Sequence, residues 1–111
     1  MNIQELLYPP DESEKSLGWT FLTNHCHVLV CLSQNPNMRI RDIARAVGIT
    51  DRAVQRILSE LEEGEALSKV RDGRRNYYKL NYDLPLRHPL ESHRTVGELL
   101  NSVRPKAEVA A

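Results

Sequence analysis

Residues 40–61 constrain the fold of this chain more than any other stretch. Their apolar residues recur at helical spacing in two runs, and Gly48 stands between the runs. Glycine is the residue that most readily takes the positive φ angle of a tight turn after a helix. The stretch therefore predicts two short helices that cross at a glycine turn. The first run is Ile40, Ile43, Ala44 and Val47, and the second run is Val54, Ile57, Leu58 and Leu61.

Two helices joined in this way match the layout of a helix-turn-helix, whose second helix can lie in the major groove of DNA. The small side chain of Ala44 suits a close crossing of the two helices, and Thr50 is a good N-cap for the second one. We expect the helices over residues 41–47 and 51–63. The alternative is a plain helical hairpin in some other all-α protein.

The periodicity changes from helical to alternating after Leu67. Residues 68–71 and 74–80 are β-prone and flank the pair Asp72-Gly73, which is a strong hairpin signal. A hairpin directly after a helix-turn-helix is a wing. The predicted fold is therefore mainly α with a small β-hairpin, a winged helix-turn-helix with a three-helix core, a wing and an additional C-terminal helix.

The rest of the chain supplies weaker signals. A first helix is expected from an N-cap at Asn24 to about Gln34, with a very short strand over residues 38–40. Pro89 opens a last helix whose apolar stripe runs over residues 90–103. The expected organisation is a mobile leader over residues 1–18, the winged helix-turn-helix over 19–83, a C-terminal dimerisation helix within 84–104 and a frayed tail over 105–111.

The formal net charge of zero hides a block pattern. A neutral chain is not a generic polyanion binder, yet two basic blocks separated by an acidic one predict a positive face and a negative face. The net charges are about −3 over residues 1–38, +3 over 39–56, −4 over 57–68 and +4 over 69–79.

The outer face of the second motif helix is the first candidate site. If its apolar residues point inward, Arg52, Gln55, Arg56 and Ser59 point outward. Arginine can bond guanine and glutamine can bond adenine in a bidentate manner in the major groove. Thr50 stands at the helix start, where a phosphate can meet backbone N–H groups. The alternative is a solvated charged face, as on any surface helix.

The hairpin tip is the second candidate site. Arg71, Arg74 and Arg75 flank the predicted turn. Such a tip can reach the DNA backbone or an adjacent minor groove, where each neutralised phosphate releases counterions. The alternative is an arginine-rich turn that serves solubility.

Other chemistry has weaker support. His27 and Cys31 lie four residues apart, a spacing that can hold zinc, but no ligand motif accompanies them. A buried structural cysteine is commoner, so we expect Cys31 to be buried and inert, with metal sensing and thiol redox sensing as the alternatives. No nucleophile elbow, phosphate loop or metalloprotease spacing is present. We therefore expect no enzyme activity, cofactor or metal.

Location and assembly follow from similar arguments. The start of the chain does not have the pattern of a signal peptide, and no stretch has the length of a membrane span. A cytoplasmic protein with reduced thiols and no membrane partner is expected. The last helix has more apolar surface than the core can cover, which predicts a homodimer on palindromic double-stranded DNA. The alternatives are that this helix folds back onto its own domain and that the leader packs on a partner subunit.

Four segments carry a resemblance to a known family: WTFLTNHCHVLVCL, RIRDIARAVGITDRAVQRILSELEEGEAL, KVRDGRRNYYKL and LPLRHPLESHRTVGELL. Together they resemble small bacterial and archaeal winged-helix transcriptional regulators of the broad MarR-like type. The resemblance covers about residues 19–103 and implies sequence-specific DNA binding, a recognition helix starting near Thr50 and dimerisation through flanking helices. Carried over by position, Thr50, Arg52, Gln55 and Arg56 take recognition positions, and Arg74 and Arg75 take wing positions.

The chain departs from the family pattern at two points. The glycine that usually follows the recognition helix stands one place early, as Gly64, and Glu65 occupies its position. Either the helix ends a residue sooner, or Glu65 takes a left-handed conformation. The chain is also shorter than full MarR proteins, whose ligand pocket lies beside longer dimerisation helices, so no effector is assigned. A winged helix that binds protein or RNA is the alternative function, favoured by the acidic residues 60–65 and the neutral total charge.

Overall fold

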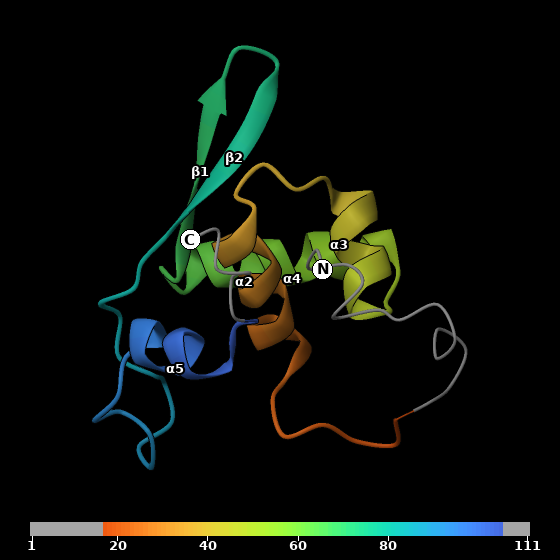
Figure 1. Cartoon of the computed structure of the whole chain (residues 1–111). Helices are drawn as coiled ribbons and strands as arrows, with labels where there is room; N and C mark the ends of the chain where they lie inside the picture. The colour runs from red at the N-terminus through yellow and green to blue at the C-terminus, as the bar shows by residue number, and fades with distance from the viewer. Residues whose placement is uncertain (1–16, 106–111) are drawn as a thin grey trace, which may run out of the picture.

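The computed structural model describes residues 17–105 (Figure 1). The expected leader lies outside the described residues apart from positions 17 and 18, and so does the expected tail apart from position 105. Within the described range, four helices and one antiparallel hairpin confirm the predicted winged helix-turn-helix. The elements are α2 (Asn24–Gln34), α3 (Ile40–Val47), α4 (Asp51–Glu63), β1 (Leu67–Asp72), β2 (Arg75–Leu80) and α5 (Val96–Val103).

Helix α2 forms the centre of the molecule. It is buried on several sides, with Val28, Cys31 and Leu32 fully enclosed, because α3, α4, α5 and β2 all pack around it. The apolar stripes of α3 and α4 supply Ile43, Val54 and Ile57 to the same core. The hairpin extends away from the helices, and α5 lies beside α2 (Figure 1).

The glycine turn between α3 and α4 forms as predicted. Gly48 ends α3 in the left-handed conformation, with φ 86°, and its N–H bonds the carbonyl of Ala44. Thr50 caps α4, since its hydroxyl accepts a hydrogen bond from the N–H of Ala53 at 3.0 Å. These two local devices fix the angle at which α4 leaves the turn.

Two predicted details at the helix starts are wrong. The N-cap of α2 is Thr23 rather than Asn24, because the Thr23 hydroxyl accepts from the N–H of Cys26 while the Asn24 amide bonds His27. No strand forms over residues 38–40, since Ile40 already opens α3.

The hairpin turn lies one residue later than predicted. Asp72 pairs with Arg75, so Gly73 and Arg74 form the two-residue turn. Gly73 has φ 63°, and a positive φ at the first turn position is the pattern of a type II′ turn, which favours glycine there. The Asp-Gly signal thus predicted the hairpin but not its tip.

The last helix is shorter than predicted. It begins at Val96 rather than near residue 90, because Thr95 and Glu98 form a capping box at its start. Residues 88–94 form turns instead, and the chain returns so that Pro85 pairs with Thr95. Val96 and Leu100 are buried against the chain's own core, as the alternative to a dimer helix proposed. Leu90 and Val103 remain exposed.

Candidate nucleic-acid interface

Helix α4 divides into a buried face and an exposed face. Its apolar residues Val54, Ile57 and Leu58 are all buried in the core. The predicted outward residues are all exposed, on the side of the helix away from this core. They are Arg52, Gln55, Arg56 and Ser59.

Thr50 lies at the exposed start of α4. Its hydroxyl caps the helix by accepting a hydrogen bond from the N–H of Ala53, so the side chain has a structural role as well as a place on the exposed surface. The N–H groups of the first turn and the helix dipole attract an anion to this end of α4, whereas the carboxylate of Asp51 in the same turn repels it.

Arg56 is tied to a carboxylate. Its Nη1 donates to Glu60 Oε1 at 3.3 Å, one helical turn further on. The same oxygen lies 2.7 Å from Nε2 of His25, near the start of α2. The hydrogen bond from His25, followed by the charge of Arg56, lowers the pKa of Glu60 below its ordinary value. The pair of Arg56 and Glu60 can be predicted from the sequence, because the two residues lie four apart on one helix. The contact of Glu60 with His25 cannot be predicted in this way.

The wing carries the second group of predicted residues. Arg71, Arg74 and Arg75 are all exposed at or beside its tip. Arg71 folds back, because its Nε donates to the carbonyl of Gly73 at 3.2 Å. Arg74 and Arg75 form no ion pair with any residue of the described range. The wing extends beyond the helices (Figure 1), so its turn at residues 73–74 lies at an extremity of the fold.

The cysteines and histidines do not form a reactive or metal-binding group. Cys26 and Cys31 are free and buried, and burial raises the pKa of Cys31 to about 12. A thiol with so high a pKa is a poor nucleophile and metal ligand near neutral pH. In residues 17–105 no three His, Cys, Asp or Glu side chains gather as a metal site.

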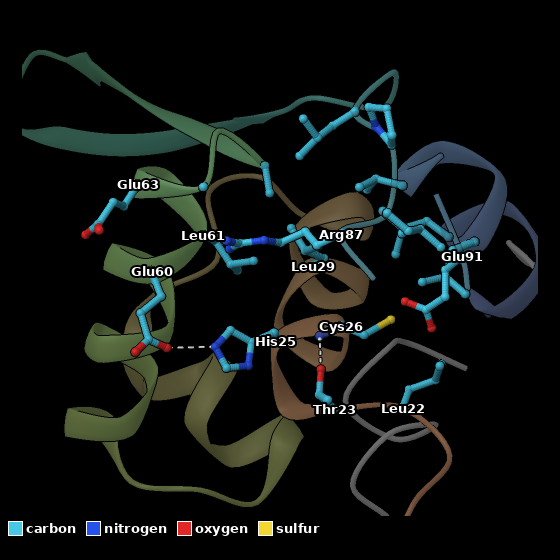
Figure 2. A pocket seen from close by; sticks show the side chains of 18 of the residues that line it. Leu22, Thr23, His25, Cys26, Leu29, Glu60, Leu61, Glu63, Arg87 and Glu91 are labelled. Atoms are coloured by element: carbon cyan, nitrogen blue, oxygen red, sulfur yellow. Dashed lines mark hydrogen bonds and ion pairs between the residues drawn. The ribbon is translucent and has the colours of Figure 1, made fainter. Parts of the chain in front are cut away.

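A groove that the sequence analysis missed lies behind α4 (Figure 2). It has a volume of about 750 Å³ and lies between α2, the end of α4, the connection over residues 84–91 and α5. Leu29 and Leu61 line its floor, while His25, Glu60 and Arg87 bring polar groups into it. Four separate stretches of chain build the groove, so no local pattern predicts it.

A helix-turn-helix followed by a hairpin defines the winged helix-turn-helix class of protein. Residues 23–74, from the N-cap of α2 to the turn of the wing, match the model of the MarR family. A little under half of the chain is therefore similar to the MarR family, which consists of DNA-binding transcription regulators rather than enzymes. Comparisons with curated proteins and with solved structures gave no match. Across residues 17–105, no helix has the length and apolar character needed to cross a bilayer.

Proposed function

We propose that this chain binds specific sites in double-stranded DNA and regulates transcription there. The observation that carries the proposal is the exposed face of α4, on which arginine and glutamine project from a helix whose other face is anchored in the core. Side chains on a rigid helix can be inserted into a major groove with little loss of conformational freedom. Arg52, Gln55 and Arg56 would read base edges, with Thr50 and Ser59 beside them.

The wing serves as the second contact in this proposal. Arg74 and Arg75 stand at the tip without a carboxylate partner in the described range, so they are free to neutralise phosphates or enter a minor groove. Arg71 lies beside them and stiffens the turn through its bond to Gly73.

The acidic end of α4 fits the DNA proposal better than it fits a protein or RNA module. Glu60 and Glu63 line the groove behind α4 together with His25. Glu60 bonds His25 at this groove, while the side chains of Arg52 and Arg74 are exposed to solvent.

The test separates residues that would contact base edges from residues that would contact only the phosphate backbone. In fluorescence anisotropy, the wild-type chain should bind a random duplex in low salt and lose affinity steeply as salt is added. Arg52→Ala should weaken a selected site by about tenfold more than it weakens random DNA. Arg74→Ala should weaken both alike and reduce the salt slope by about one.

Arg94→Ala is the matched control, because Arg94 is exposed but pairs with Glu98 next to α5. It removes the same charge and should leave both affinities close to those of the wild type. Equal losses in all three variants, or no duplex binding by the wild type in low salt, would contradict the proposal.

A further inference from the structure

The groove behind α4 has the size and lining of a small-molecule site (Figure 2). Its volume of about 750 Å³ lies within the range of about 300–1,000 Å³ that such sites occupy. Most of the side chains that line it are apolar. Leu29, Leu61 and Leu100 belong to the buried core, and Leu99 is half-buried beside them. The floor is therefore part of the packed core and does not depend on a ligand for its form.

The charged groups around this floor are mainly negative. Glu60 and Glu63 stand at the end of α4, and Glu91 stands on the opposite side of the groove (Figure 2). The C-terminal end of α4 adds the negative pole of its helix dipole. The groove also contains the guanidinium of Arg87 and the imidazole of His25, which bonds Glu60 at 2.7 Å. Carboxylates thus outnumber the guanidinium around the floor.

Arg87 is engaged with α4 rather than with a carboxylate. Its Nη1 lies 3.1 Å from the position that a Cβ on Gly64 would take, and the side chain extends toward α4 and away from Glu91 (Figure 2). A cation at the C-terminal end of a helix is stabilised by the helix dipole. Within residues 17–105, no ion pair joins Arg87 to a carboxylate. Its charge is therefore placed against the negative end of α4.

Glu91 is the carboxylate that this arrangement leaves open. Its side chain is exposed and projects from the connection toward α2 (Figure 2). In the part of the chain that the structure describes, its carboxylate has no hydrogen bond or ion pair. A carboxylate beside an apolar floor, not paired with a cation of the protein itself, suits an ammonium group that is attached to an apolar body.

We propose that the groove binds a small amphipathic amine, a molecule with one ammonium group and an aromatic or aliphatic body. The body lies on the floor formed by Leu29, Leu61 and Leu99, and the ammonium group bonds the carboxylate of Glu91. The surplus of carboxylates disfavours an anionic ligand of the same shape. The exposed residues of α4 such as Arg52 do not line the groove, so the amine binds whether or not DNA is present.

The experiment uses three probes of similar shape and different charge, which are phenylbutylamine, phenylbutanol and phenylbutanoate. Isothermal titration calorimetry of the full chain at neutral pH measures the affinity for each. The three compounds share one apolar body, so differences between them report the effect of charge. Phenylbutylamine should bind about tenfold more tightly than phenylbutanoate, with phenylbutanol between them.

Charge removal tests the contact with Glu91. Glu91→Gln keeps the size of the side chain and should lower the affinity for phenylbutylamine by about twofold to fivefold, with little effect on phenylbutanol. Glu62→Gln is the matched control, because Glu62 is exposed on α4 but does not line the groove. It removes the same charge and should keep the wild-type affinity for phenylbutylamine.

A change in the floor tests the location. Leu99→Asn should weaken all three probes by a similar factor of about threefold to tenfold, because it removes apolar surface that their common body covers. Val103→Asn is the control on the same helix, since Val103 is exposed and does not line the groove. Circular dichroism of each variant checks that the helices are intact.

The outcomes decide the proposal without reference to DNA. If the three probes bind equally, or if phenylbutanoate binds best, the carboxylates do not select the ligand and the inference is wrong. If none of the probes binds at millimolar concentration, the groove does not admit a small molecule, and the inference is overturned. An equal loss in Glu62→Gln and Glu91→Gln would contradict a contact with Glu91. Each of these failures leaves the proposed function untouched.

Discussion

Glu65 occupies a backbone conformation that suits glycine. The N–H of Ala66 bonds the carbonyl of Leu61, and the N–H of Glu65 bonds the carbonyl of Glu62, which together form a Schellman motif at the end of α4. Glu65 stands at the left-handed position of that motif, with φ 65°. Of the two outcomes open from the sequence, the structure takes the left-handed one. The side chain therefore strains the backbone.

Glu65→Gly should stabilise the protein. Glycine takes this φ without steric cost, and the gain is partly offset by the greater freedom of glycine in the unfolded chain, so we expect about 0.5–1 kcal/mol. Chemical denaturation followed by circular dichroism measures the change. Glu63→Gly, in the last turn of α4, is the control and should destabilise by up to about 1 kcal/mol. A loss of stability in Glu65→Gly would show that the left-handed conformation is not strained.

At the scale of the element, α5 shows how a cap positions a short helix. Thr95 accepts from the N–H of Glu98, and the Glu98 carboxylate accepts from the N–H of Thr95. The backbone of Gly97 approaches the carbonyl of Tyr82 so closely that a Cβ there would lie 2.9 Å from that oxygen. The cap and this close approach together place Val96 and Leu100 in the core.

Thr95→Ala should therefore lower the free energy of unfolding by about 1 kcal/mol, because α5 loses an N-cap. Thr95→Ser keeps the hydroxyl and should stay close to the wild type. Equal unfolding midpoints for Thr95→Ala and the wild type in urea would show that the capping box does not stabilise α5.

Local signals predicted the elements that they act on directly. Gly48 and Thr50 each satisfy a backbone requirement within four residues, so the helix-turn-helix could be predicted from the sequence. The start of α5 could not be predicted, because Pro89 and Thr95 both suit the start of a helix. The choice between them depends on the pairing of residue 85 with residue 95. The exposed face of α4 was predicted by periodicity, but the partner of Glu60 lies 35 residues away on another helix.

At the scale of the whole molecule, several large apolar side chains remain open to solvent. Trp19 and Phe21 pack edge to face with their ring centres 4.8 Å apart, yet Phe21 is 91% exposed. Leu90 is 80% exposed in the connection before α5. Exposed apolar groups of this size are typical of a surface that another chain covers.

We therefore predict a homodimer in which the second chain covers Trp19 and Phe21. Sedimentation at micromolar concentration should give the mass of two chains, and Phe21→Ser should shift the equilibrium toward one chain without loss of helix, because Phe21 lies outside the core. A wild-type chain that sediments as a monomer would contradict the prediction, and the alternative in which α5 serves its own domain would then be sufficient.

Selection of bound duplexes from a random pool tests the central claim most directly. If α4 reads base edges and two copies act together, the selected DNA should contain one short motif, repeated as an inverted pair about one helical turn apart. The motif should weaken at particular positions when the selection is repeated with Arg52→Ala. A selected pool with no motif beyond that of the starting pool would contradict sequence-specific binding by this chain.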